Sequence, residues 1–253
     1  NKNLYIIRNG AKMRLKICDN PQQVGYLAAA DIALQLNTKK NSTLILPTGS
    51  TPLPVYESII KMYKNGDVSF GDAVTFNLDE YIGIAEDHAE RYYNFMMRNL
   101  FSKVDIKPEN INIPDSRTND PDGECKRYEE KYRKTGGADL AVLGIGQNGH
   151  IGFNEPGTPF SSVTHVTSIA ESTVKANSRF FASEAQVPKK AMTMGISTIL
   201  SAKKIILLAT GKSKHDILIK LLQQTSANES IPATALLLHD DAVIYADREA
   251  ITG

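Results

Sequence analysis

Short, continuously apolar runs alternate along this chain with longer runs of helical periodicity. The strand-like runs cover residues 43–46, 73–78, 139–145, 204–209 and 242–246. Strands that are apolar along their whole length are usually covered on both faces, which is typical of a mostly parallel sheet between helices. The pattern therefore predicts an α/β fold with a mostly parallel sheet and flanking helices.

Amphipathic helices are predicted between these strands. Val24, Ala28, Ile32 and Leu36 step by four and so share one helical face. Further helical runs cover residues 56–63, 91–101, 124–134 and 213–223. With no linker, repeat or low-complexity segment between them, residues 13–253 are predicted to form a single domain. Residues 1–12 precede Met13 and are predicted to be an upstream or added extension.

Composition narrows the classes of function. The 29 basic residues balance 28 acidic ones, so neither a large nucleic-acid surface nor an anionic-membrane surface is indicated. Cys18 and Cys125 lack the spacing of a metal site or a redox pair, and are interpreted as reduced cysteines of a cytoplasmic protein. No apolar run is long enough for a bilayer, and no signal-peptide pattern is present.

Three polar loops follow predicted strands, after Leu46, Phe76 and Leu143. In open α/β sheets, ligands bind at the carboxyl ends of the strands. The first loop reads Thr48-Gly49-Ser50-Thr51-Pro52 and leads into a helix, an arrangement that suits an anion because helix N-termini carry free N–H groups. An ordinary strand-to-helix turn explains these residues equally well. No lysine follows as in an ATP-binding P-loop.

The loop after Leu143 contains Gly144, Gly146 and Gly149 at the spacing of a dinucleotide fingerprint. That fingerprint needs a helix running on for several turns after its third glycine, and Gly152 and Pro156 interrupt any such helix. The loop instead presents His150 and Glu155. A carboxylate beside an imidazole fixes its tautomer and raises its basicity, which suits proton transfer. No cluster with metal-ligand spacing is found.

The remaining candidates are carboxylates and cations. Asp79 and Glu80 are adjacent on a strand end and so point in different directions; one of them facing a cleft would serve as a general base, whereas a solvated carboxylate or a cap is the common alternative. Arg179 and Lys214 are candidate phosphate clamps, although each taken alone is typical of a surface charge.

Taken together, the ordered motifs resemble the glucosamine-6-phosphate deaminase (isomerase) family. The matching stretches are residues 46–52, 76–81, 144–157, 176–181, 187–189, 211–214 and 231–233. The resemblance runs from Met13 to the C-terminal end. It implies a modified Rossmann-like, three-layer α/β/α sandwich without a nucleotide cofactor, and conversion of D-glucosamine 6-phosphate and water to D-fructose 6-phosphate and ammonia in amino-sugar catabolism.

The resemblance also implies roles for single residues. His150 is expected to move the proton when the pyranose ring opens, supported by Glu155 and Asn148, and Asp79 to take the C2 proton. The phosphate is expected to bind Gly49, Ser50, Thr51, Arg179 and Lys214. Neither metal nor coenzyme is required, because isomerisation needs proton shuttling alone. A mobile lid is expected around residues 169–188, coupling phosphate binding to closure.

Two departures from the family pattern matter. Asn148 stands where some members carry aspartate, which leaves Glu155 as the charged partner of His150. Allosteric hexameric members place basic residues where this chain has Val163, His165 and Thr167. We therefore expect a non-allosteric enzyme and favour a monomer over an allosteric hexamer, with a sugar phosphate as its small-molecule partner and neither nucleic acid nor membrane.

Three alternatives share features with this interpretation. A 6-phosphogluconolactonase is similar in fold and phosphate loop, but residues 79–81 and 154–157 favour the deaminase. A galactosamine-6-phosphate deaminase acts on a sugar that differs from glucosamine 6-phosphate only in its configuration at C4, and residues 176–181 favour glucosamine. A sugar-phosphate-binding regulator without turnover usually carries a DNA-binding segment, and none is visible.

Overall fold

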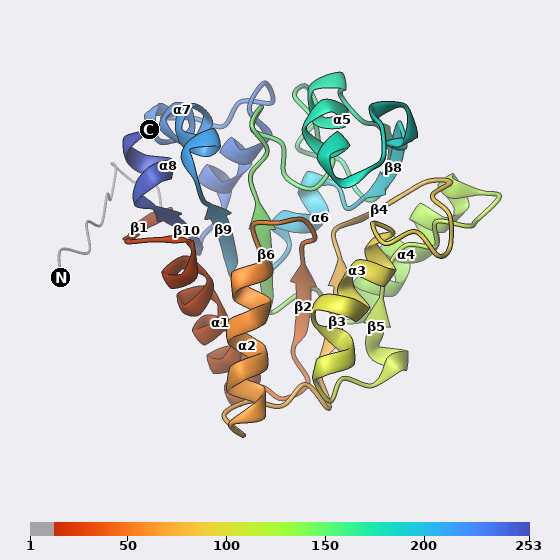
Figure 1. Cartoon of the computed structure of the whole chain (residues 1–253), viewed down its shortest axis with the longest axis vertical. Helices are drawn as coiled ribbons and strands as arrows, with labels where there is room; N and C mark the ends of the chain where they lie inside the picture. The colour runs from red at the N-terminus through yellow and green to blue at the C-terminus, as the bar shows by residue number, and fades with distance from the viewer. Residues whose placement is uncertain (1–12) are drawn as a thin grey trace.

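The computed structural model describes residues 13–253, and a seven-stranded parallel sheet runs through its centre (Figure 1). The strand order is β1-β10-β9-β6-β2-β3-β5. These strands are β1 Arg14–Cys18, β2 Thr43–Leu46, β3 Val74–Asn77, β5 Ile111–Asn112, β6 Leu140–Gly144, β9 Ile205–Ala209 and β10 Ala242–Asp247. The predicted extension at residues 1–12 lies outside the described residues.

Helices cover both faces of this sheet. The α-helices are α1 Pro21–Thr38, α2 Leu53–Lys64, α3 Tyr92–Asn99, α4 Pro121–Lys134, α5 Glu171–Asn177, α6 Ile196–Leu200, α7 His215–Gln223 and α8 Arg248–Thr252. Short 3-10 helices are η1 Phe101–Lys103, η2 Pro108–Asn110, η3 Ser178–Phe180, η4 Glu184–Gln186, η5 Lys212–Lys214 and η6 Pro232–Leu238. No helix in the described part of the chain is both long and apolar enough to span a membrane.

Side-chain alternation along the strands creates two cores. Leu44 and Leu46 pack with α1, α2 and α3, whereas Ile45 between them packs with the tyrosines of α4 and the leucines of α7. Successive strand residues point to opposite faces of a sheet, so a fully apolar strand needs a helical layer on each side. The predicted three-layer α/β/α sandwich is confirmed.

The contact between α1 and α2 depends on one small residue. A Cβ atom on Gly25 would lie 2.5 Å from Pro54, closer than atoms can approach. Asn20 begins α1 by accepting a hydrogen bond from the Gln23 N–H at 2.9 Å, which satisfies one of the helix's free donors. The predicted helix over residues 24–36 is thus confirmed and extended at both ends.

The prediction of a polar loop after Phe76 is wrong, because β3 continues to Asn77 and a second short strand follows. Leu78 separates β3 from β4, Asp79–Tyr81, which belongs to a second, antiparallel sheet of order β4-β8-β7. Its other strands are β7 His165–Ser168 and β8 Lys190–Thr193. Asp79 pairs with Thr193, so the backbone leaves the central sheet to pair with a strand over a hundred residues later. Sequence periodicity carries no information on such a distant pairing partner.

Candidate active site

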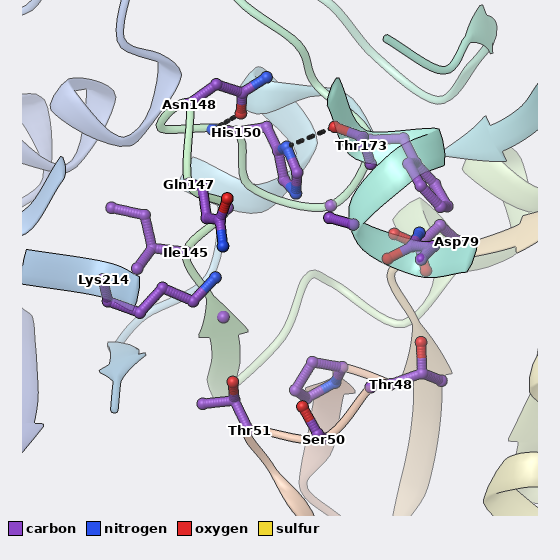
Figure 2. A pocket seen from close by; sticks show the side chains of 18 of the residues that line it. Thr48, Ser50, Thr51, Asp79, Ile145, Gln147, Asn148, His150, Thr173 and Lys214 are labelled. Carbon is purple, nitrogen blue, oxygen red and sulfur yellow. Dashed lines mark hydrogen bonds between the residues drawn. The ribbon is translucent and has the colours of Figure 1, made fainter. Parts of the chain in front are cut away.

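The three polar segments identified in the sequence meet at one cavity of about 860 Å³ (Figure 2). It lies at the carboxyl ends of β2, β3 and β6, with residues from α5 and η5 completing its wall. The predicted site residues that line it are Gly49, Ser50, Thr51, Asp79, Asn148, His150, Arg179 and Lys214. Glu155 is not in the lining and lies behind His150.

One end of the cavity combines hydroxyls with two cations. Gly49 has a φ of 93°, a left-handed conformation that glycine adopts readily, in the turn before Ser50. The Arg179 Nη2 donates to Ser50 Oγ at 3.2 Å, which joins the segment after α5 to this loop. Burial, followed by repulsion from Arg179, lowers the pKa of Lys214 to about 8. The partly buried Lys214 and the exposed Arg179 together favour a dianionic ligand such as a phosphate ester.

Asp79 lines the cavity as a buried carboxyl group, with 7% of its surface exposed. No cation among residues 13–253 forms an ion pair with it. Burial, and then the nearby charge of Glu80, raise its pKa to about 8. A carboxylate in this setting is a strong enough base to accept a proton near neutral pH.

Glu80 points away from Asp79 and binds backbone N–H groups. Its Oε1 accepts from Tyr81 at 2.9 Å and Tyr92 at 3.0 Å, and its Oε2 accepts from Tyr93 at 3.1 Å. Burial raises its pKa to about 7, although these hydrogen bonds and Arg91 oppose the rise. Glu80 therefore satisfies the free donors at the start of α3 and fixes Tyr92, whose ring lines the cavity.

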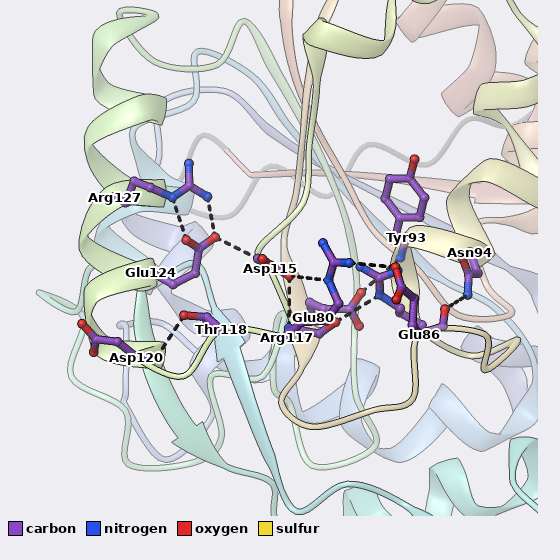
Figure 3. A network of polar contacts seen from close by, with 12 residues as sticks. Glu80, Glu86, Tyr93, Asn94, Asp115, Arg117, Thr118, Asp120, Glu124 and Arg127 are labelled. Carbon is purple, nitrogen blue, oxygen red and sulfur yellow. Dashed lines mark hydrogen bonds and ion pairs between the residues drawn. The ribbon is translucent and has the colours of Figure 1, made fainter.

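Polar contacts continue outward from Glu80 along the surface (Figure 3). Arg117 forms ion pairs with Glu86 at 2.7 Å and Asp115 at 3.2 Å, and the Asp115 N–H donates to Glu124 at 2.9 Å. These contacts connect α4 with the loop that precedes α3. The Arg117 pairs are solvent-exposed, so we assign them little stabilising free energy.

Glycines shape the loop between β6 and Glu155. The Gly146 N–H donates to the His150 carbonyl at 2.9 Å, and a Cβ on Gly146 would lie 2.2 Å from the His150 ring. Gly149 and Gly152 have φ values of 90° and 58°. No helix follows Gly149 before α5, so the loop lacks the helix N-terminus that holds a pyrophosphate. The glycines let the backbone fold closely around His150.

Polar partners surround the His150 ring and its loop. Its Nδ1 lies 3.4 Å from Glu155 Oε2 and 3.3 Å from Thr173 Oγ1. Asn148 Nδ2 donates to Glu155 Oε2 at 2.7 Å, and Asn148 Oδ1 accepts from the His150 backbone N–H at 3.2 Å. Asn148 thus contacts the Glu155 carboxylate and the His150 backbone, and Figure 2 shows the second of these contacts as a dashed line.

The charge of Glu155 decides which ring nitrogen carries the proton. Burial raises the pKa of Glu155, but hydrogen bonds with His150, Asn148 and Thr173 outweigh burial and hold it below its usual value. An ionised carboxylate accepts only, so the neutral imidazole places its hydrogen on Nδ1 and leaves Nε2 as a free acceptor. This arrangement can move a proton.

Tyr92 and Thr173 are among the lining residues that were not predicted from the sequence. Tyr92 is the first residue of α3 and forms side-chain hydrogen bonds with Thr48 and Tyr81. Thr173 lies within the segment predicted as a lid, but no motif distinguishes it from its neighbours. Single tyrosines and threonines are common in any helix, so only the tertiary contacts reveal them.

Comparison with known proteins identifies the family of this chain. Residues 20–245 match the family of glucosamine-6-phosphate isomerases and 6-phosphogluconolactonases. The chain belongs to this family. A glucosamine-6-phosphate deaminase of Thermoanaerobacter sp. (strain X514) is 47% identical over 238 residues, or 94% of each chain. The family and the enzyme class predicted from the motifs are confirmed.

The chain is similar in structure to two solved proteins, at very different levels of sequence identity. A monomeric glucosamine-6-phosphate deaminase superposes with a TM-score of 0.91 at 43% identity, covering 93% of this chain and 98% of that one. The 6-phosphogluconolactonase of Thermotoga maritima superposes with a TM-score of 0.73 at 21% identity, covering 93% of this chain and 100% of that one. The second likeness shows the shared fold alone.

Proposed function

We propose that this protein is a glucosamine-6-phosphate deaminase, converting D-glucosamine 6-phosphate and water to D-fructose 6-phosphate and ammonia in amino-sugar catabolism. The observation that carries the proposal is one cavity holding an imidazole, two cations and a buried carboxylate that has no ion-pair partner within residues 13–253. Identity of 47% with a named deaminase, against 21% with a lactonase, supports this choice within the family.

The phosphate group binds at the end of the cavity with Ser50, Arg179 and Lys214. Two cations and a glycine-containing loop hold the dianion there, distant from the reacting carbons. Binding energy gained at this remote group orients C1 and C2 of the sugar against the proton-transfer residues.

His150 opens the pyranose ring. With its hydrogen on Nδ1 toward Glu155, the ring uses Nε2 to take the proton from the C1 hydroxyl and gives a proton to the ring oxygen as the C1–O5 bond breaks. The products of this step are the open-chain aldehyde and an unchanged imidazole. Asn148 and Glu155 hold the loop and the tautomer.

Asp79 then moves hydrogen between carbons. Its carboxylate takes the C2 proton to form an enolamine and returns a proton to C1, so C1 is reduced and C2 is oxidised without any added redox partner. Water adds to the resulting C2 iminium, ammonia leaves, and the proton released in this hydrolysis protonates the C1 oxygen to give the ketose hydroxyl. A pKa of about 8 lets Asp79 hold the proton between the two transfers at neutral pH.

Ammonia release tests the proposal directly. We expect release from glucosamine 6-phosphate well above release from galactosamine 6-phosphate, and none from either with Asp79→Asn, which should still bind the phosphate ester. A preference for galactosamine 6-phosphate would mean that this sugar is the substrate. An active Asp79→Asn enzyme would refute the assignment of Asp79 as the base. His150→Gln should lower the rate with the cyclic sugar more than the rate with an open-chain substrate. Equal losses of rate with both substrates would refute the ring-opening role of His150.

Rate measurements also test the predicted absence of allostery. Val163, His165 and Thr167 stand where allosteric members have basic residues, so we expect no site for an anionic effector there. Rates should rise hyperbolically with substrate concentration and remain unchanged by N-acetylglucosamine 6-phosphate. Sigmoidal rates made hyperbolic by that ester would contradict the expectation.

A further inference from the structure

The segment from α5 to η3 is attached at both ends to groups of the proposed reaction. At its start, the Ala170 N–H donates to Glu155 Oε1 at 3.3 Å. At its end, Arg179 reaches Ser50 of the phosphate-binding loop at 3.2 Å. A single short helical segment therefore joins the ring-opening group to the phosphate site.

Thr173 makes the contact with the ring-opening group. Its side chain is buried, and its Oγ1 lies 3.3 Å from His150 Nδ1. The same hydroxyl hydrogen-bonds with Glu155. Because Glu155 is ionised and can only accept, the hydroxyl donates to Glu155 and has its own lone pair free to accept from Nδ1–H. Figure 2 shows Thr173 reaching from α5 to the His150 ring.

We propose that Thr173 is a positioning residue that orients His150 and makes that orientation depend on phosphate capture by Arg179. The role in turnover rests on the function proposed above, whereas the structural coupling does not. Thr173 and Arg179 are six residues apart on the continuous stretch of α5 and η3. A ligand that fixes Arg179 therefore also seats Thr173 against the imidazole.

Glu155 alone is a weaker restraint on the ring. It already accepts from Asn148 and Ala170, so the contact of its Oε2 with Nδ1 at 3.4 Å is only one of several contacts that this carboxylate makes. The threonine hydroxyl supplies the second, directional contact that determines how the ring is turned. Loss of the hydroxyl should leave His150 in the cavity with its ring in the wrong orientation. Misplacement of a catalytic group lowers the rate roughly 100-fold.

Nitrogen NMR of the histidine rings tests the coupling without any turnover. The chain has five histidines, and His150→Gln identifies the signals of that ring by their loss. Inorganic phosphate is added to the full-length wild type, Thr173→Val and Thr173→Ser. We expect phosphate to shift the His150 signals in the wild type and in Thr173→Ser, which keeps the hydroxyl, and to shift them far less in Thr173→Val.

Ser178→Ala is the matched control on the same segment. Its hydroxyl donates to the Lys175 carbonyl at 2.8 Å and does not hydrogen-bond with His150, so this variant should respond to phosphate like the wild type. An undiminished response in Thr173→Val, or no response in the wild type, would overturn the coupling. A response lost equally in Ser178→Ala would also overturn it, because the effect would then belong to the segment as a whole.

A double-mutant cycle tests the role in turnover. We expect Thr173→Val to lower kcat/KM for glucosamine 6-phosphate by roughly 10–100-fold, with Thr173→Ser close to wild type. In a His150→Gln background, Thr173→Val should lower kcat/KM little further, because both substitutions impair the same function, ring opening by His150. Independent, multiplying losses would overturn the positioning role. Absence of ammonia release by the wild type would refute the proposed function and leave the NMR result standing.

Discussion

Replacing Asp79 by asparagine should stabilise the protein while abolishing its proposed activity. The substitution keeps the shape of the side chain and removes its charge. Asp79 is buried, and burial together with Glu80 raises its pKa from 3.8 to about 8. A protein that keeps an unpaired carboxylate in such a place gives up stability to do so.

The magnitude follows from the difference between the two pKa values. An acid with a raised native pKa holds its proton more tightly in the native state, so its stabilising contribution is complete below about pH 4 and is lost as pH rises to about 8. The interval from 3.8 to 7 spans about 3 pH units at about 1.4 kcal/mol each, which gives about 4 kcal/mol at pH 7. The amide needs hydrogen-bond partners of its own, so we expect a gain of roughly 2–4 kcal/mol, or roughly 5–15 °C in Tm.

Urea and thermal unfolding of wild type and Asp79→Asn between pH 4.5 and 8 measure this gain. The difference in unfolding free energy should be small at pH 4.5 and grow steadily toward pH 8. Asp139→Asn is the matched control with the opposite sign. Asp139 is buried too, but Lys203, Lys39 and the Thr43 N–H hold its pKa below the usual value despite burial. Its amide variant should be less stable at pH 7, and the deficit should shrink toward acid pH.

Two results would refute this reasoning. A stability difference between wild type and Asp79→Asn that does not change with pH would mean that the pKa of Asp79 is not raised in the native state. A less stable Asp79→Asn at pH 8 would mean that the carboxylate is stabilised by partners that outweigh its burial. Either result would also weaken its assignment as the base.

Three further predictions concern the proposed reaction. Because the pKa of Lys214 is lowered to about 8, KM for the sugar phosphate should rise above pH 8, and Lys214→Met should raise KM roughly 10–100-fold and remove that rise. Glu80→Gln removes the charge that helps raise the pKa of the adjacent base, so the acidic limb of kcat/KM should move to lower pH in rate–pH profiles. Glu124→Gln, at another buried carboxylate, should leave the limb in place. Gly146→Ala places a methyl group 2.2 Å from the His150 ring, so kcat should fall at least 10-fold, and an alanine variant with wild-type kcat would refute the tight packing.

The apolar strand pattern was sufficient to predict the layers of the fold. Continuously buried strands such as residues 43–46 need helices on both faces, and helices such as residues 24–36 show which face they bury. This information is local, because the apolar periodicity of each strand or helix indicates which of its residues are buried. The candidate residues Asp79 and His150, and those proposed to bind the phosphate, followed from the polar segments at the strand ends and from the family resemblance.

Tertiary structure alone decided how those residues are tuned. The pairing of Asp79 with Thr193 places its carboxylate in a second sheet, and the burial that raises its pKa comes from surrounding segments that no local pattern specifies. The contacts of Thr173 with His150 and of Arg179 with Ser50 likewise join segments far apart in the chain. Burial, distance and charge coupling are properties of residues brought together by folding. The sequence thus determined which side chains are available, and the packing determined which of them act on one another.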